Sequence, residues 1–320
     1  MDMEDSPAPP VAAAPRGQFD ARYLAFLETA AQLRPKLHRY CARMIGSTLD
    51  GEDVVQDALF DAYRRLDTYD DRRPLGPWLF RIAHNRCIDF LRRREVRVQA
   101  EDAAAEPAFT AAVDPPGPAL GRAVERLVRQ LPPKERACVL LKDVFDYTIE
   151  EIADLVESTP GGVKAALHRG REKLAAAQRP PEISPRMSSE TQRLLQLYVD
   201  RFNQRDWDGL RELIAADATV RVADRFEGSI GESPYLGRYA RASAAAPLFA
   251  VLSEVDGEPA IVIYAEIAGP APGAGAGPAV PRAFVRLSIA EGHIVQITDY
   301  THCPWVMSAA EHVSPIPARA

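Results

Sequence analysis

Two short segments near the middle of the chain have the pattern of two helices joined by a tight turn. Thr148 and Glu151 are spaced as a capping box, in which side chains satisfy the first backbone groups of a helix. Thr159 and Pro160 are suited to begin a second helix after a break. That second segment, 160–179, carries five Lys or Arg residues against one Glu, a balance that fits contact with DNA phosphates. The pattern indicates a helix-turn-helix, and a helical hairpin with a merely solvated charged face is the alternative.

A second segment, 76–94, combines aromatic and basic side chains on a predicted helix. Trp78 and Phe90 interleave there with Arg81, Asn85 and Arg86. Aromatic rings beside cations are what unstacked, single-stranded bases need. The spacing of Trp78 and Phe90 fits simple burial in a core equally well.

Acidic side chains recur at helical spacing in a third segment, 51–65. Glu52, Asp53, Asp57 and Asp61 stand beside apolar residues there. Such an acidic face is either solvated or a docking face for a basic partner.

Composition limits the kinds of protein that can carry these motifs. The chain has 320 residues, enough for two or three domains, and 47% of them are hydrophobic, which excludes a wholly disordered protein. The acidic, Pro/Ala-rich start lacks the features of a signal peptide, and no run approaches the roughly 20 apolar residues of a membrane span. Four cysteines lie too far apart for a zinc site or a disulfide framework. We therefore expect a cytoplasmic protein with no cofactor and no metal.

The predicted elements change character along the chain. Up to about residue 178 apolar residues recur at helical spacing, which indicates two all-α domains. Helices are then expected at 189–205 and 207–215, the second with Asp206 as its N-cap. Antiparallel strands follow, with hairpin turns at Asp256-Gly257 and Glu291-Gly292, so this last part is predicted to be α+β. The predicted strands are 219–222, 248–255, 260–267, 282–289 and 294–298.

Proline-rich and aperiodic stretches give the predicted boundaries. We expect a disordered tail at 1–19, a helical domain at 20–97, a linker at 98–121, a helix-turn-helix domain at 122–178, a Pro-rich linker at 179–187, the α+β domain at 188–312 and a tail at 313–320. Residues 188–320 carry 11 basic and 16 acidic residues, so this last part is acidic.

The order of the motifs resembles the sigma-70 family, and specifically the compact extracytoplasmic-function sigma factors, which keep only regions two and four. The resemblance rests on GEDVVQDALFDAYRR, PWLFRIAHNRCIDFLRRR and LVRQLPPKERACVLLKDVFDYTIEEIADLVESTPGGVKAALHRGREKL, in that order. It covers about residues 20–178. It implies a region-two helical bundle, a region-four helix-turn-helix, and core RNA polymerase and promoter DNA as partners.

The resemblance also implies roles for particular residues. Those matching the surface that docks on the clamp coiled coil of core polymerase are Asp53, Gln56, Asp57 and Asp61. Those matching the surface that melts and reads the minus-ten element are Trp78, Arg81, Asn85, Arg86, Arg92 and Arg93. Those on the helix that enters the major groove at the minus-thirty-five element are Lys164, His168, Arg169 and Arg171. Small residues depart from the family pattern there, namely Gly162, Ala165, Ala166 and Gly170.

The last part of the chain resembles the SnoaL-like domain, a cone-shaped α+β fold. The resemblance rests on element order and on stretches such as LLQLYVDRFNQRDWDGLRELIAADATVRV and GHIVQITDY. SnoaL-like folds include enzymes that use Asp or His in an enclosed pocket, so Asp299, Tyr300 and His302 form a candidate pocket. A cone open to solvent with converging polar groups would favour a ligand site, and a sealed apolar interior would favour a scaffold.

We expect a non-enzymatic sigma factor that is regulated by its own C-terminal domain. One alternative is a bifunctional protein whose C-terminal domain binds or converts a small metabolite, and another is a conventional repressor or activator that acts without core polymerase. The short linker keeps the acidic domain near the helical domains at an effective concentration of order mM. We therefore expect an intramolecular contact with region two or region four, and covering of a DNA- or core-binding face is the favoured outcome. The sequence identifies no anti-sigma partner.

Overall fold

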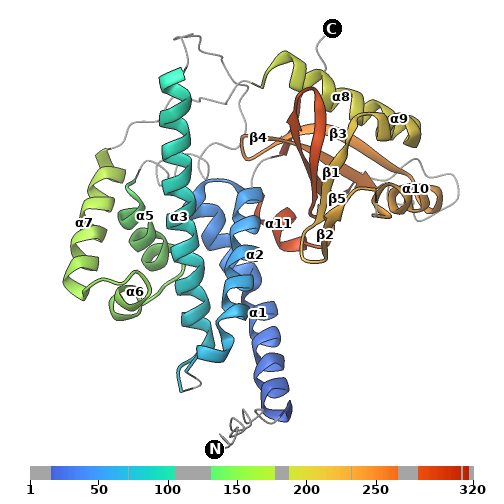
Figure 1. Ribbon diagram of the computed structural model, residues 1–320. Coiled ribbons are helices and arrows are strands. Elements are labelled where there is room, and N and C mark those ends of the chain that lie inside the picture. Colours follow the sequence, from blue (N-terminus) through green and yellow to red (C-terminus); the bar gives the residue numbers. More distant parts are fainter. Residues whose placement is uncertain are drawn as a thin grey trace, which may run out of the picture.

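The computed structural model describes residues 16–70, 72–104, 131–176, 187–231, 233–265, 280–310 and 313–316. Within them a helical half leads into a half built on a sheet (Figure 1). Nearly all of the predicted Pro-rich linker and parts of the predicted tails lie outside the described residues, as do residues 105–130.

Three long helices and one short turn form the first helical unit. The side chain of Ser47 caps the second long helix by accepting a hydrogen bond from the N–H of Asp50. Gly51 lets this helix approach the first one closely, because a Cβ at this position would lie 2.7 Å from the Cα of Ala42. The helices extend into the tail and the linker predicted at 1–19 and 98–121. Their bounds are α1 (Arg16–Ile45), α2 (Thr48–Arg64), η1 (Leu66–Thr68) and α3 (Leu75–Ala104).

Shorter helices form the second unit, and their local signals agree with the sequence. The capping box is confirmed, since the N–H of Glu151 donates to Oγ1 of Thr148 and the Glu151 carboxylate accepts from the N–H of Thr148. Gly170 permits close helix packing, because a Cβ there would lie 2.9 Å from Cγ2 of Val139. The bounds are α5 (Pro133–Val139), η2 (Leu140–Val144), α6 (Ile149–Leu155) and α7 (Pro160–Ala176).

The two helical units share one hydrophobic core. The ring of Tyr40 on α1 lies 5.9 Å from that of Phe145, which follows η2. The ring of Phe80 on α3 lies 5.7 Å from that of Tyr147. The two helical units therefore pack directly on each other.

Among the described residues, seven strands form one sheet in the order β2-β1-β6-β5-β4-β3-β7. The pairing of β1 with β6 is parallel, so the sheet is mixed and not wholly antiparallel as predicted. The α+β prediction itself is confirmed. The strands are β1 (Ile214–Val222), β2 (Phe226–Ser229), β3 (Leu248–Val255), β4 (Glu258–Ala265), β5 (Val280–Ala290), β6 (His293–Asp299) and β7 (Val313–Pro315).

Turn signals fix two of the hairpins. Asp256 and Gly257 have φ values of 51° and 92°, and Glu291 and Gly292 have values of 50° and 74°. Two consecutive positive φ angles are the geometry of tight hairpin turns, so both predicted turns are confirmed. The helix expected at 207–215 is shorter, because β1 already begins at Ile214. The helices of this half are α8 (Ser189–Gln204), α9 (Trp207–Glu212), α10 (Tyr235–Ala245) and α11 (Pro304–Ala309).

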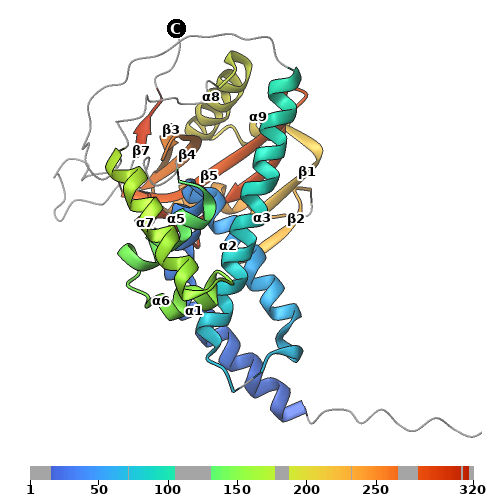
Figure 2. The same ribbon diagram turned by 90° about the vertical axis from the view of Figure 1, so that its left-hand side faces the viewer.

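The two faces of the sheet pack against different partners. On β4, Ile261 and Ile263 join the core with α8 and α10. Ala260 and Val262 alternate to the other face, as side chains of a strand do. There they join a cluster that includes Leu49 of α2 and residues of α11. One face of the sheet is therefore turned to the helical half, and Figure 2 shows the same arrangement from the side.

Candidate functional site

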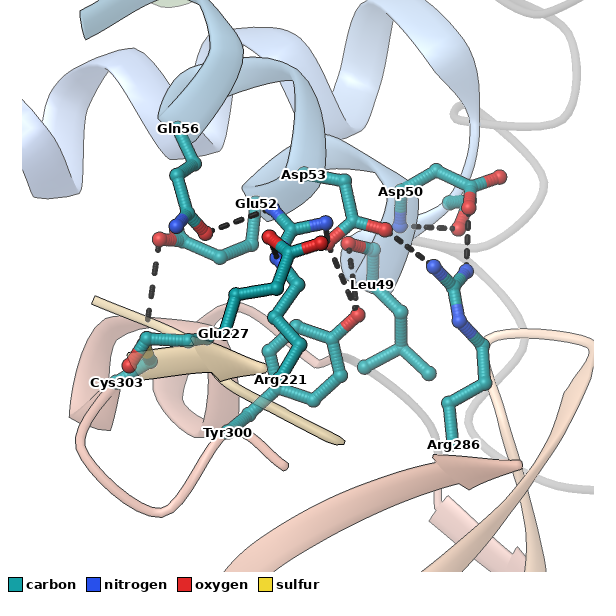
Figure 3. A network of polar contacts seen from close by, with 12 residues as sticks. Leu49, Asp50, Glu52, Asp53, Gln56, Arg221, Glu227, Arg286, Tyr300 and Cys303 are labelled. Carbon is teal, nitrogen blue, oxygen red and sulfur yellow. Dashed lines mark hydrogen bonds and ion pairs between the residues drawn. The ribbon is translucent and has the colours of Figure 1, made fainter. Parts of the chain in front are cut away.

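The acidic face of α2 lies against the C-terminal sheet domain (Figure 3). Arg286 of β5 forms ion pairs with both Asp50 and Asp53. Arg221 of β1 lies with Nη1 3.4 Å from the Asp53 carboxylate, and its Nη2 donates to Oε1 of Gln56 at 2.7 Å. We call the contact between these helical and sheet residues the interdomain interface. Asp53 stands between two arginines of the sheet domain there.

Tyr300 occupies the middle of the interdomain interface. It follows β6 directly, and its side chain is fully buried. Its hydroxyl lies 3.4 Å from the carbonyl oxygen of Leu49 and 3.3 Å from Oδ1 of Asp53. The Leu49 side chain is buried in the same cluster as Tyr300 and Val262. The interface therefore combines an apolar centre with charged contacts around it.

Glu52 forms a second charged group in the interdomain interface. Its carboxylate accepts from Nε of Arg34 at 3.1 Å and from Nε1 of Trp305 at 2.6 Å. Arg34 belongs to α1, and its Nη1 also donates to Asp224 of the sheet domain at 2.7 Å. The guanidinium of Arg34 lies over the Trp305 ring, 5.1 Å from its centroid, a cation–π arrangement.

Burial shapes the electrostatics of both carboxyl groups. Loss of solvent raises the pKa of Glu52, while the facing Arg34 opposes that rise. Loss of solvent likewise raises the pKa of Asp53, and Arg286 and Arg221 oppose it. Burying a charge is costly unless a partner of opposite sign is present. The three arginines are therefore what allows these acids to lie within the interdomain interface.

The β3–β4 hairpin contacts the N-terminus of α2. Oγ1 of Thr48 donates to the carboxylate of Asp256 at the tip of the hairpin. A negative charge at the start of a helix is favourable, because the unpaired N–H groups there carry partial positive charge. The hairpin therefore adds a favourable electrostatic contact at one end of the interface.

The four residues predicted to bind core polymerase divide into two groups. Asp53 and Gln56 are covered by the sheet domain. Asp57 is exposed. Asp61 forms ion pairs with Arg65, at 3.2 Å, and with Arg86 of α3. Only the first half of the predicted docking surface thus lies in the interdomain interface.

All six residues predicted for the minus-ten element lie on α3. The ring of Trp78 packs 4.7 Å from that of Tyr69 and is partly buried, so it contributes to the helical core. Asn85 is exposed, whereas Arg81 is partly buried. Arg86 pairs with Asp61. The remaining two, Arg92 and Arg93, are exposed.

Two residues predicted for the minus-thirty-five element form ion pairs, and a third lies beside a carboxylate. Nε of Arg169 lies 2.9 Å from the carboxylate of Glu135. Nη2 of Arg171 lies 2.5 Å from that of Asp143, and Nδ1 of His168 lies 3.1 Å from that of Glu172. Lys164 is exposed on α7. Carboxylates of the same chain therefore contact three of the four residues predicted for the minus-thirty-five element.

Two of the three residues of the candidate C-terminal pocket contact Arg238, and the third faces α2. Asp299 is fully buried and accepts hydrogen bonds from Arg238 at 2.7 Å and from Tyr239 at 2.8 Å. His302 is exposed beside the same arginine, with 3.4 Å between Nε2 and Nη1. Tyr300 instead contacts α2. Asp299 therefore lies in a buried ion pair with Arg238, and Tyr300 belongs to the interdomain interface.

Comparison with known proteins assigns the helical half to a family. The family model for Sigma-70 region 2 matches residues 30–97, and the model for Sigma-70 region 4 matches residues 121–174. The ECF RNA polymerase sigma factor SigW of Bacillus subtilis is 30% identical over 162 residues, which are 47% of this chain and 87% of that protein. RNA polymerase sigma factor CarQ of Myxococcus xanthus is 34% identical over 151 residues, which are 47% of this chain and 87% of CarQ. The chain is an extracytoplasmic-function sigma factor.

The sigma factor is also similar to longer and structurally known proteins. ECF RNA polymerase sigma factor SigG of Mycobacterium tuberculosis is 31% identical over 259 residues, and the match covers 72% of this chain but only 65% of SigG. The match to the solved structure of Mycobacterium tuberculosis SigJ covers 89% of this chain and 98% of SigJ, with 18% identity and a TM-score of 0.33. A Mycobacterium tuberculosis LEH-like epoxide hydrolase covers 38% of this chain and 90% of that chain, with 12% identity and a TM-score of 0.29. No helix in the described part of the sigma factor is both long and apolar enough to cross a membrane.

Sequence reasoning did not find the sheet-domain side of the interdomain interface. Arg221 and Arg286 lie within predicted strands, and no motif surrounds them or Trp305 in the sequence. Arg34 lies in α1 without a motif around it. A single arginine in an alternating strand is an ordinary surface residue, so the sequence of this sigma factor carries no local signal for these contacts.

Proposed function

We propose that this sigma factor directs core RNA polymerase to promoters to initiate transcription, and that its C-terminal domain restrains it by covering the core-binding face of α2. The observation that carries the proposal is the engagement of Asp53 and Gln56, two residues implied to bind core polymerase, by Arg286 and Arg221. The same side chains cannot face the sheet domain and a polymerase helix at once. Docking and core binding are therefore mutually exclusive.

The restraint has the form of competition by an internal partner. An acidic helix face that binds a basic partner is here occupied by two arginines of the same chain. A partner that binds only the undocked form has an apparent Kd equal to its intrinsic Kd divided by the undocked fraction. Anything that favours undocking therefore raises the affinity for core polymerase without touching the core-binding residues.

We further propose that α3 and α7 contact promoter DNA. Asn85, Arg92 and Arg93 are exposed on α3, which supports contact with an opened strand. Lys164 and the outer face of α7 would meet duplex DNA. The relatives are transcription factors, and we propose that this chain likewise acts beside polymerase in the cytoplasm and catalyses no reaction of its own.

The test compares two arginines on the same strand. Arg286→Ala removes a cation from the interdomain interface, and Arg282→Ala removes an exposed cation from β5. Both substitutions change the net charge by the same amount. Binding to core enzyme and transcription from genomic promoters are measured for both full-length variants and for the unchanged chain. We expect Arg286→Ala to bind core more tightly and to transcribe more, and Arg282→Ala to behave as the unchanged chain does.

A substitution at Asp57 can test core binding without affecting docking, because Asp57 is exposed and lies outside the interdomain interface. Asp57→Lys in the Arg286→Ala background should abolish core binding while the helical content is retained. Unchanged core binding in this double variant would refute the assignment of α2. Equal transcription by Arg286→Ala and Arg282→Ala would refute the restraint.

A further inference from the structure

The far end of α2 presents an exposed apolar patch that the sheet domain does not cover. Phe60 and Tyr63 on α2 are 62% and 45% exposed, and Leu24 and Leu27 on α1 are 57% and 42% exposed. The ring of Tyr63 lies 5.6 Å from that of Tyr23, which shows that the two helices lie side by side at this point. Figures 1 and 2 agree that these ends of α1 and α2 extend away from the sheet domain. We call these four side chains the free patch.

The free patch continues the stripe of α2 that the sheet domain covers. Residues three or four positions apart lie on the same side of a helix. Asp53, Gln56, Phe60 and Tyr63 follow that spacing, so they form one line along α2. The first two contact Arg286 and Arg221, and the last two are exposed. One continuous surface is therefore half covered and half open.

Large exposed apolar side chains are unevenly distributed over the molecule. Among the described residues nine such side chains are markedly exposed, and four of them belong to the free patch. Clustered apolar groups on a surface indicate a site of protein contact. Exposed Asp57 borders the patch on α2, which adds the acidic character that suits a basic partner.

We propose that core RNA polymerase first binds the free patch. Its contact with α2 then extends to the covered half of the helix and displaces the C-terminal domain. This inference rests on the proposed function and concerns how the restraint is released. An internal partner at an effective concentration of order mM recaptures its site quickly. A competitor that must wait for complete undocking is limited by the opening rate. A competitor that already holds the neighbouring half of the surface can occupy each covered position as it opens.

The two routes differ in the kinetics of association. If undocking must come first, the observed rate of binding reaches a plateau at the undocking rate as the core concentration rises. If polymerase first binds the free patch, the observed rate of binding continues to rise with core concentration beyond the undocking rate. The measurement is stopped-flow fluorescence of the labelled full-length sigma factor mixed with core enzyme, with the undocking rate taken from hydrogen exchange of α2.

Variants connect the kinetics to the patch. Phe60→Ala changes an exposed side chain, so the fold should persist, and we expect association of the intact chain to slow by about tenfold, within the range that interface substitutions produce in association rates. In the Arg286→Ala background, where the covered half is accessible, the same change should slow association several-fold less. Phe226→Ala is the matched control, because Phe226 is 43% exposed on β2 in the sheet domain, outside the free patch.

The outcomes are distinct. Two results together support first binding at the free patch. The observed rate of binding keeps rising with core concentration, and Phe60→Ala slows association more in the intact chain than in the Arg286→Ala background. A plateau at the undocking rate, or an equal effect in both backgrounds, overturns it while the proposed function stands. If neither the intact chain nor Arg286→Ala binds core enzyme, the proposed function fails and this inference fails with it.

Discussion

Trp305 offers a way to loosen the interdomain interface without altering either charged partner. Its indole N–H donates to the buried carboxylate of Glu52 at 2.6 Å, and its ring lies under the guanidinium of Arg34. Trp305→Phe keeps an aromatic ring in place but removes the donor. In the undocked form the indole N–H can be hydrated, so the change acts chiefly on the docked form.

The expected loss follows from the interactions that disappear. A hydrogen bond to a charged group contributes roughly 1.5–3 kcal/mol, and removal of one partner leaves the buried carboxylate less well satisfied. Phenylalanine also holds a cation less strongly than tryptophan, although a cation–π contact of about 0.5–1 kcal/mol is partly retained. We therefore expect docking to weaken by about 2 kcal/mol, which corresponds to a roughly 30-fold increase in the undocked fraction.

Two assays read this change. Hydrogen exchange of the α2 amides should accelerate, and the apparent Kd for core enzyme should fall by up to about 30-fold as long as the docked form dominates. Trp207→Phe is the control, because Trp207 packs 5.4 Å from Phe202 within the C-terminal domain. An unchanged apparent Kd and unchanged exchange in folded Trp305→Phe protein would show that the indole contact does not hold the domain in place.

Three further predictions concern the helical half. Burial lowers the pKa of His38 and of His84 to about 4, so the unfolded chain binds more protons than the folded chain as the pH falls from 6.5 towards 4. The free energy of unfolding should therefore drop in that window by up to roughly 3 kcal/mol per histidine. His84→Gln should make the free energy of unfolding depend less on pH, which urea titrations at pH 7 and pH 5 would measure. Gly51→Ala should lower the melting temperature, since its Cβ would meet neighbouring helix backbone at 2.7 Å; an unchanged melting curve would contradict that close packing. Glu135→Gln should free Arg169 for DNA phosphates, so duplex affinity should rise and its salt dependence should steepen, whereas equal salt slopes would place Arg169 away from DNA.

Local signals in the sequence determined much of the helical half and the turns. Thr148 and Glu151 cap α6 as their spacing predicts, because both partners lie within one helical turn. Asp256-Gly257 makes the β3–β4 turn for the same reason, since positive φ angles at adjacent residues are a local demand. The motif order then indicated the sigma-70 family, and the α+β character of the last part followed from helices succeeded by strands.

Only the tertiary structure showed which surface of α2 is covered and by which residues. Arg286 and Asp53 are 233 positions apart, and Trp305 and Glu52 are 253 positions apart. No periodicity or spacing rule connects residues at such distances, because their contact depends on how two separately folded units meet. The same holds for the ion pair of Asp299 with Arg238, two residues that lie 61 positions apart. The sequence therefore predicted an acidic docking face and an adjacent regulatory domain, while the packing of the sheet against α2 decided that Asp53 and Gln56 are covered and that Phe60 and Tyr63 remain exposed.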